Sequence, residues 1–336
     1  MTFSVALATY NGQEFLEAQL ESLGAQTMRP AELVVSDDGS SDGTLAIVSR
    51  FAKKASFPVR ILRNTRRLGY RTNFMQAAAA CSSELIAFCD QDDVWLPNKL
   101  ALMHNSFYET DILLAYHNAV LIDAENRRRG HIFFRRGVQV FNSLSINPWR
   151  IIPGNVQVIR RSLLRLNPLH VESVDPYCPE EPMPHDHWFP FWASVFGKIA
   201  YIPDSLTQYR LHHANTSGWP PHLAAYVVDQ IQHAAAYVRG NSIGANNRVQ
   251  LLHRAQCSGL SVDMNKIKAA ISFYKFVAAQ NEKRLEIYTS RRSARRLKSL
   301  IRLLRAGAYT KIKPDSLGPD ALLLDAFIGM PFAPRA

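Results

Sequence analysis

The first third of the chain alternates short apolar runs with segments of helical periodicity. Four runs are mainly apolar and have the length of buried strands: residues 3–8, 33–36, 59–62 and 85–89. Between them, apolar side chains recur at helical spacing around residues 16–23, 45–51 and 72–81. This alternation predicts right-handed βαβ units and therefore an α/β fold with a mostly parallel sheet flanked by helices.

The pattern loosens after about residue 111. Further strands are predicted at residues 113–118, 156–159, 199–202 and 206–209, with a helix at 187–196 before the last two. Beyond about residue 221 the sequence has helical patterns only. We therefore expect one α/β domain at residues 1–220, divided into halves at 1–110 and 111–220, and a mainly α-helical C-terminal region at residues 221–336.

Composition is that of a globular protein. Hydrophobic residues make up 47% of the 336 residues and charged residues 20%. No segment approaches the roughly 20 consecutive apolar residues that a membrane span needs, and the N-terminus lacks the pattern of a signal peptide. We expect a soluble, cytoplasmic protein. The four cysteines lack the spacing of a zinc site or a disulfide framework, which predicts buried thiols.

The net charge of +11 indicates an anionic partner. Seven basic residues lie within residues 291–305 without any acid, and Leu297, Ile301 and Leu304 recur among them at helical spacing. This stretch predicts a basic amphipathic helix that can lie on an anionic membrane surface at the inner face of the cell membrane. The alternative is a solvated, salt-bridged helix end.

Polar segments follow three of the predicted strands, where the carboxyl ends of parallel strands bind ligands. The segments are Thr9-Tyr10-Asn11-Gly12, Asp37-Asp38-Gly39-Ser40 and Asp90-Gln91-Asp92-Asp93. Several acids at one sheet edge repel one another unless a cation or a ligand neutralises them. Oxygen ligands without nearby cysteines favour Mg²⁺ or Mn²⁺ over zinc. Each segment alone also fits an ordinary turn or helix cap.

Taken together and in this order, the three segments resemble the donor half of the family 2 glycosyltransferases, which have the Rossmann-like GT-A fold. The resemblance implies that residues 1–110 bind a nucleotide sugar. It assigns the base and ribose to one set of residues: Thr9, Tyr10, Asn11, Asp37, Asp38, Asp90 and Gln91. Asp38 would accept the imino proton of uracil or thymine, and Asp92 would ligate the divalent cation with help from Asp93.

A loop that closes over the donor in that family matches Asn64, Leu68, Gly69 and Asn73, and Arg67 beside it could reach phosphate.

The second half resembles the rhamnosyltransferase-like branch of the same family. Its signature is carried by residues 184–188, Pro-His-Asp-His-Trp, and by residues 209–215, Tyr-Arg-Leu-His-His-Ala-Asn. The resemblance makes Asp186 the general base, gives His212 or His213 a place at the metal, and closes the Arg-any-His segment over the pyrophosphate. It also puts Gly154, Asn155 and Trp188 at the acceptor. A helix N-cap is the structural alternative for Asp186.

These residues predict a metal-dependent, inverting glycosyltransferase. The donor expected from the branch is dTDP-rhamnose, and the acceptor is a hydroxyl of a surface polysaccharide or a lipid-linked oligosaccharide. Three alternatives stay open: a hexosyltransferase that uses a UDP-sugar, a nucleotidyltransferase that makes sugar nucleotides, and a catalytically silent GT-A-fold scaffold. Nucleic-acid binding is not expected, because no zinc, helix-turn-helix or RNA-recognition signature accompanies the charge.

Overall fold

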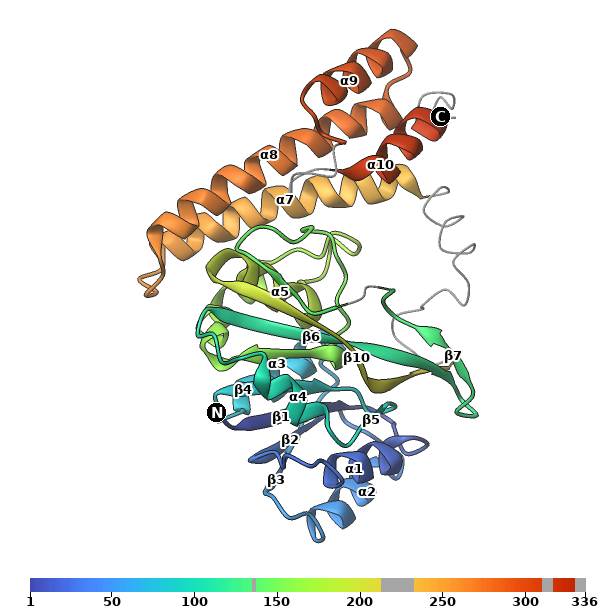
Figure 1. Ribbon diagram of the computed structural model, residues 1–336, viewed down its shortest axis with the longest axis vertical. Helices are drawn as coiled ribbons and strands as arrows, with labels where there is room; N and C mark the ends of the chain where they lie inside the picture. The colour runs from blue at the N-terminus through green and yellow to red at the C-terminus, as the bar shows by residue number, and fades with distance from the viewer. Residues whose placement is uncertain (135–136, 213–232, 310–316, 330–336) are drawn as a thin grey trace. The chain divides into compact units, whose positions relative to one another are not determined.

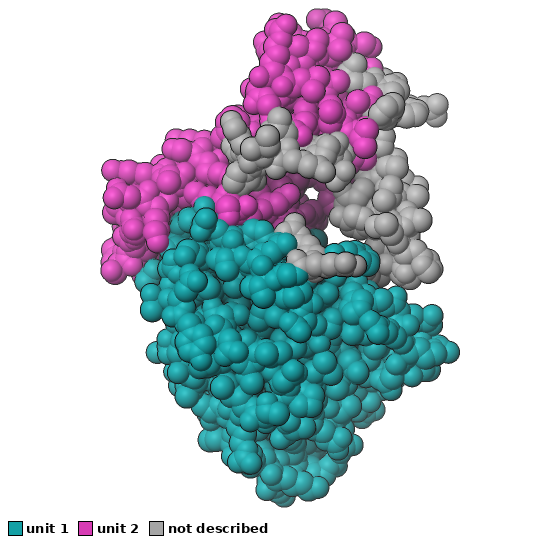
Figure 2. All heavy atoms as spheres, viewed as in Figure 1, with its two compact units in different colours: residues 1–143, 151–167, 184–217 teal, residues 144–150, 168–183, 218–336 magenta. Residues whose placement is uncertain are grey.

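The structure is a computed structural model that describes residues 1–134, 137–212, 233–309 and 317–329 (Figure 1). The chain divides into two compact units, coloured separately in Figure 2. Unit 1 comprises residues 1–143, 151–167 and 184–217, and unit 2 comprises residues 144–150, 168–183 and 218–336. Two short segments from the middle of the chain thus group with the C-terminal helices, which a single boundary near residue 220 does not anticipate. That boundary itself lies outside the described residues.

The first part of unit 1 is a parallel α/β sheet. Its strands are β1 (Phe3–Thr9), β2 (Glu32–Asp37), β3 (Val59–Arg63) and β4 (Leu85–Cys89), and they lie in the order β3-β2-β1-β4. Each neighbouring pair in this order is parallel. Helices α1 (Leu16–Gly24), α2 (Thr44–Ala52) and α3 (Tyr70–Ala80) connect these strands. Every element predicted for this region is present. The prediction succeeds because the apolar runs of this region are short and are separated by turn residues.

The sheet continues beyond β4 with mixed strand directions. Its further strands are β9 (Gln157–Arg160), β6 (Ile112–Asp123), β10 (Lys198–Leu211) and β5 (Val94–Trp95), with β7 (Arg128–His131) on β6 and β8 (Gln139–Phe141) on β10. Strand β9 is antiparallel to both β4 and β6, whereas β6 and β10 are parallel. The two short strands predicted at 199–202 and 206–209 are one strand, β10, whose pairing with β6 shifts register between Ile202 and Thr207.

Further helical segments of unit 1 lie between these strands. They are α4 (Lys99–Asn105), the 3₁₀ segments η1 (Gly154–Val156) and η2 (Arg161–Glu172), and α5 (His185–Phe196). The last five residues of η2, residues 168–172, belong to unit 2.

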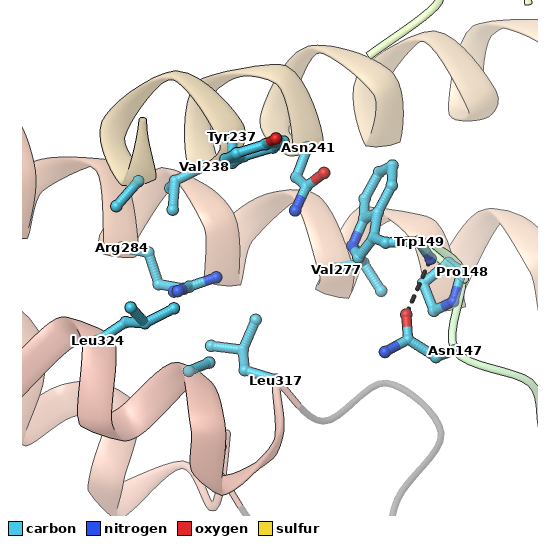
Figure 3. A pocket seen from close by; sticks show the side chains of 12 residues that line it. Asn147, Pro148, Trp149, Tyr237, Val238, Asn241, Val277, Arg284, Leu317 and Leu324 are labelled. Atoms are coloured by element: carbon cyan, nitrogen blue, oxygen red, sulfur yellow. Dashed lines mark hydrogen bonds between the residues drawn. The ribbon is translucent and has the colours of Figure 1, made fainter. Parts of the chain in front are cut away.

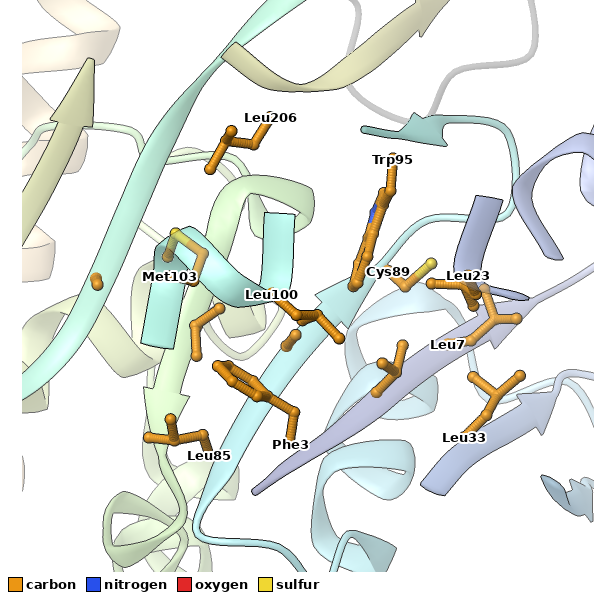
Figure 4. Packing of buried hydrophobic residues seen from close by; sticks show 14 of the residues in the cluster. Phe3, Leu7, Leu23, Leu33, Leu85, Cys89, Trp95, Leu100, Met103 and Leu206 are labelled. Atoms are coloured by element: carbon orange, nitrogen blue, oxygen red, sulfur yellow. The ribbon is translucent and has the colours of Figure 1, made fainter. Parts of the chain in front are cut away.

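One large apolar cluster holds the sheet and its helices together. It joins side chains of β1, β2, β4, α1 and α4, among them Phe3, Leu7, Leu23, Leu85 and Leu100 (Figure 4). All five are buried. Burial of side chains of this size contributes about 1.5–3 kcal/mol each. This core fixes the strands whose carboxyl ends carry the polar segments.

A buried carboxylate ties the amino end of β2 to its neighbours. The hydroxyls of Ser4 and Ser82 donate to Glu32 Oε1 at 2.7 and 2.6 Å, and Arg60 pairs with Oε2 at 3.1 Å. Burial alone would raise the pKa of Glu32, but the hydrogen bonds from Ser82 and Ser4 and the charge of Arg60 outweigh it and lower that pKa.

Unit 2 is built on helices. They are α7 (Ala234–Cys257), α8 (Met264–Thr289), α9 (Ser293–Arg305), α10 (Gly318–Leu324) and a π-helical turn, Asp325–Gly329. The predicted helical character of this region is confirmed for the residues described. Within those residues, no helix combines the length and the apolarity that crossing a membrane requires.

A buried ion pair links α8 to the last turn of the described chain. Arg284 donates to both carboxylate oxygens of Asp325, at 2.8 Å for Nε to Oδ2, and the hydroxyls of Tyr288 and Tyr309 donate to the same carboxylate. Asp325 is fully buried. The partners of this buried carboxylate are therefore all side chains of unit 2.

A cavity of about 180 Å³ lies beside this ion pair within unit 2 (Figure 3). Its wall is mostly apolar, with Trp149, Val277 and Leu317 facing it together with the guanidinium of Arg284.

Candidate active site

The loops after β1 and β2 are joined by side-chain hydrogen bonds. Thr9 Oγ1 donates to Asp37 Oδ1 at 2.9 Å, and both the hydroxyl and the amide of Ser40 donate to the same carboxylate. Asn11 has a φ of 46°, a left-handed conformation that asparagine tolerates better than most residues, and its Oδ1 accepts from Ser41 N at 2.9 Å. Thr9 and Asp37 are buried. The first two predicted segments therefore meet at one sheet edge.

The Asp38 carboxylate fastens the loop that follows β3. Its Oδ1 accepts from Leu68 N at 2.7 Å and from Asn64 Nδ2 at 3.0 Å, and its Oδ2 accepts from Gly69 N at 2.8 Å. A carboxylate has about four lone-pair positions, and the described residues fill three of them. The predicted hydrogen bond to a nucleobase stays a prediction, with one acceptor position left for it.

Asn73 lies beneath the same loop. Its amide nitrogen donates to Ser36 O at 2.9 Å, and its Oδ1 accepts from Asn64. Because the residue is 2% exposed, it serves the site by holding the loop and the strand end rather than by facing a ligand. Arg67, in contrast, is exposed, and its guanidinium lies 4.0 Å from the centre of the Tyr10 ring. These two side chains form a cation–π contact at the rim of the site.

Gln91 clamps the acidic segment after β4 to the end of β1. Its Oε1 accepts from Tyr10 N at 2.9 Å and its Nε2 donates to Tyr10 O at 3.1 Å. A side chain on Gly12 would approach Gln91 Oε1 to 2.3 Å, which explains the glycine at that position. The amide of Gln91 is thus used on the backbone. These two hydrogen bonds fix the position of the acidic segment relative to the end of β1.

Asp93 is held entirely by the protein. Its Oδ1 accepts from Arg210 N at 3.0 Å, and its Oδ2 accepts from the side chain of Asn155. The buried ammonium of Lys99 lies nearby, donating to Asn155 O at 2.7 Å and stacking 3.6 Å from the centre of the Trp95 ring. Burial, together with the charge of Asp92, raises the pKa of Asp93 to about 8, and burial lowers that of Lys99 to about 7.

Asp90 and Asp92 keep carboxylate oxygens for a ligand. Ligand atoms of Asp90, Asp92 and Asp93 lie within 4.8 Å of one another. Among the described residues, the Asp90 carboxylate accepts no hydrogen bond, and burial together with the charges of Asp93 and Asp92 raises its pKa. A cation would relieve this repulsion, and carboxylate oxygens suit Mg²⁺ or Mn²⁺. The residues present therefore fit a divalent cation, which Asp90 and Asp92 would hold.

His212 stands directly at this cluster. Its Nε2 lies 2.8 Å from Asp92 Oδ2, and its ring packs 5.0 Å from that of Phe15, centre to centre. The structure thus brings together Asp92 and His212, the two residues that the sequence assigned to the metal. His213 lies outside the described residues.

The arginine of the same segment does not face the site. Arg210 is buried, and its guanidinium donates to Asp92 O at 2.8 Å and to Asn126 Oδ1 at 2.7 Å while lying over the Phe15 ring. The prediction that this segment closes over a pyrophosphate is therefore wrong for Arg210, whose guanidinium is bonded within the protein. Its donors are used to fix the acidic segment.

Asp186 opens α5, next to the acidic segment. It lies in the first turn of the helix, and its Oδ1 is buried without a hydrogen-bond partner among the described residues. The negative charge of Asp186 contributes to the raised pKa of Asp90, after burial and the two neighbouring aspartates. The predicted general base, Asp186, and Asp90, which was predicted to face the donor ribose, therefore share one electrostatic environment.

Three comparisons with known proteins bear on this arrangement. Residues 4–165 match the sequence model of glycosyl transferase family 2. This segment is a family 2 glycosyltransferase domain. The uncharacterized glycosyltransferase alr2836 of Nostoc sp. is 27% identical over 222 residues, which cover 64% of this chain and 66% of that protein.

Two further proteins have assigned names. The UDP-Glc:alpha-D-GlcNAc-diphosphoundecaprenol beta-1,3-glucosyltransferase WfgD of Escherichia coli is 31% identical over 120 residues, 36% of this chain and 46% of WfgD. The matched segments thus cover less than two thirds of the length of alr2836 and of WfgD. The crystal structure of S. aureus TarS 1–349 in complex with UDP matches with a TM-score of 0.54 and 18% identity, covering 93% of both chains. This likeness confirms the predicted fold.

The acceptor side of the glycosyltransferase domain differs from the prediction. Trp188 is fully buried, with its indole nitrogen bonded to Asn167 Oδ1 at 3.3 Å, so it belongs to the core and cannot contact an acceptor from this position. Asn155 is buried as well and holds Asp93. Gly154 leaves room for His185, whose Nε2 would lie 2.0 Å from an added Cβ.

Sequence reasoning missed Lys99 and treated Arg210 as a ligand contact. Both are buried basic residues that brace the acidic segment. A lysine four residues after Trp95 is a weak signal, because exposed lysines are common at helix starts. The partner atoms, Asn155 O and Thr207 Oγ1, come from segments more than fifty residues away.

Proposed function

We propose that the chain is an inverting glycosyltransferase that moves a sugar from a nucleoside diphosphate donor onto a hydroxyl of a glycan or a lipid-linked oligosaccharide. The family match of residues 4–165 supports this activity, and the name of WfgD supports the class of acceptor. The observation that carries the proposal is the buried, unpartnered Oδ1 of Asp186 beside the acidic segment.

Asp186 is the proposed general base. A sugar hydroxyl is a weak nucleophile, so a carboxylate must accept its proton as the new glycosidic bond forms. An oxygen without a competing hydrogen-bond donor is available for that proton. Direct attack by the hydroxyl displaces the nucleoside diphosphate in one step and inverts the anomeric carbon. No covalent enzyme intermediate is needed.

Asp90 and Asp92 are the proposed holders of Mg²⁺ or Mn²⁺, with His212 beside them. When bound, such a cation supplies positive charge to the departing diphosphate. The chain contributes the arrangement of these ligands: Gln91 fixes the segment against β1, and Arg210 fixes it against β10. Asn155 holds the Asp93 carboxylate, and Lys99 holds Asn155, so Asp93 does not compete for the ligand positions.

The donor base is proposed to meet Tyr10, Asn11 and Asp38. The exposed stack of Arg67 on Tyr10 offers an aromatic face and a cation at the rim. The rhamnosyltransferase-like signature favours a dTDP-sugar, whereas the UDP bound to TarS and the UDP-glucose in the name of WfgD favour a uridine nucleotide. Both donors present the same pyrimidine imino group to Asp38. They differ in the ring methyl group and the ribose 2′-hydroxyl.

The test is calorimetric titration of the purified chain with UDP and with dTDP, each with and without Mn²⁺. Wild type should bind one of them in a Mn²⁺-dependent manner. Asp92→Ala should abolish the Mn²⁺-dependent part, whereas the matched control Asp111→Ala, which removes an exposed carboxylate paired with Lys198, should bind as wild type does. Absence of binding to either nucleotide under all conditions would contradict the transferase proposal and favour a scaffold.

A further inference from the structure

Helix α9 has three distinct faces along its thirteen residues. One face is buried and consists of Arg296, Ser299, Leu300 and Leu303. Leu300 and Leu303 join the apolar cluster that also contains Ile287 of α8, and Figure 1 shows α9 lying against α8. This face accounts for the attachment of α9 to unit 2. Within the described part of the chain, the other two faces are exposed.

A row of large apolar side chains forms the second face. Leu297, Ile301 and Leu304 follow one another at spacings of four and three residues, which places them on one side of the helix. Their exposed fractions are 48%, 38% and 47%. Single exposed apolar residues need no explanation, but these three are adjacent. The apolar part of α9 is therefore wider than the part that packs against the protein.

A row of cations forms the third face, beside the apolar row. It consists of Arg295, Lys298, Arg302 and Arg305, and all four are exposed. Arg291 and Arg292, also exposed, continue the charge ahead of the helix. Among the described residues, no acidic side chain pairs with any of these six. Glu286, the nearest acid that precedes the row, accepts a hydrogen bond from Ser299 instead. Within the described part of the chain, the row is therefore not a salt-bridged helix end.

We propose that this face of α9 docks onto the surface of an anionic lipid bilayer. Its apolar row would enter the boundary between headgroups and acyl chains while the neighbouring cations contact the headgroups. A second copy of the same face is disfavoured, because two unpaired cation rows would repel each other. A polyanion such as nucleic acid would use the cations but gain nothing from the apolar row. The inference goes beyond the transferase proposal and does not depend on it.

The test measures binding of the full chain to vesicles of phosphatidylcholine alone and of phosphatidylcholine mixed with phosphatidylglycerol. Two variants remove one row each: Leu297→Ser/Ile301→Ser/Leu304→Ser and Arg295→Gln/Lys298→Gln/Arg302→Gln/Arg305→Gln. Matched controls remove exposed residues of the same kinds elsewhere: Phe134→Ser/Val138→Ser/Val171→Ser and Arg29→Gln/Lys53→Gln/Lys54→Gln/Arg161→Gln. Circular dichroism and nucleotide titration of every variant report on folding and on the donor site separately.

We expect wild type to partition onto the phosphatidylglycerol vesicles in a salt-sensitive manner. Loss of four cations should weaken partitioning by about 100-fold or more, since each cation near an anionic surface is worth about five-fold. Loss of the apolar row should weaken it by about ten-fold or more, and both controls should bind as wild type does.

Three results would overturn the proposal. They are absence of binding to both kinds of vesicle, equal losses in the variants and their controls, and a loss confined to the cation variant. The last result would indicate a general polyanion surface. None of them bears on nucleotide binding by Asp92 and its neighbours, so failure here and failure of the transferase proposal are distinguishable.

Discussion

Replacing Gly154 by alanine tests whether the start of α5 must stay where the structure places it. The added Cβ would lie 2.0 Å from His185 Nε2, and an ordinary contact needs at least about 3.4 Å, so one group must move by about 1.4 Å. The imidazole cannot yield easily, because its ring stacks 4.0 Å from Phe74 and packs 4.7 Å from Phe88, centre to centre. We expect the free energy of unfolding to fall by about 1–3 kcal/mol.

The same shift displaces Asp186, the residue that follows His185. A misplacement of about 1 Å in a catalytic group can cost about 100-fold in rate, so sugar transfer should fall much further than stability. The assays are urea unfolding and a transfer assay with the donor that calorimetry identifies. Gly24→Ala is the control, because its Cβ meets Phe51 at an ordinary 3.6 Å.

A second variant separates a steric clash from a general loss of the fold. His185→Ala alone should also destabilise the protein, because it empties the space beside Phe74. Combined with Gly154→Ala it should relieve the clash, so the loss in the double variant should be smaller than the sum of the two single losses. Additive losses, or a Gly154→Ala variant with wild-type stability and rate, would refute the reasoning.

Three further predictions follow from buried or unpartnered carboxylates. Asp186→Asn should lower the transfer rate by about 10²–10⁴-fold and leave nucleotide binding in calorimetry unchanged; a comparable loss of binding would argue against a general base. Asp325→Ala should lower the free energy of unfolding by about 3–5 kcal/mol, because it leaves Arg284 buried without its counter-charge, and urea unfolding measures this. The lowered pKa of Glu32 means that its carboxylate stabilises the fold at pH values above the pKa in the unfolded chain, and that this stability is lost as pH falls through the lower pKa of the folded state. Glu32→Gln should flatten that acid-side part of the stability profile, and an unchanged profile would contradict the assignment.

The parallel half of the sheet was predictable from sequence because its signals are local. Apolar runs such as Leu85–Cys89 are bounded by turn residues and match the observed strand residue for residue. Strand β10 was divided in two because Pro203 and Asp204 interrupt its apolar pattern. In the structure the strand absorbs them in a shift of register against β6. The antiparallel direction of β9 was not predictable, since it depends on pairing with strands far away in the sequence.

The location of the candidate site was predictable from sequence. Which of its residues are open to a ligand and which hold the loops in place was not. Sequence spacing puts Thr9, Asp37 and Asp92 at strand ends, and the structure gathers the segments that carry them. Sequence spacing cannot show that the side-chain amides of Asn73 and Gln91 are hydrogen-bonded to the backbone, or that Trp188 is buried in the core. Such outcomes depend on partners from distant segments. Local patterns do not encode them.

The acids around the site fall into two groups once their hydrogen bonds are counted. Asp37, Asp38 and Asp93 accept bonds from the chain on both oxygens, and they hold loops in place. Asp90, Asp92 and Asp186 keep at least one oxygen without a bond from the described residues. A site built only for structural stability would have no reason to leave carboxylate oxygens open on three neighbouring acids, because the mutual repulsion of the acids is unfavourable. The open oxygens therefore favour chemistry with a cation and a proton-bearing hydroxyl over a silent scaffold.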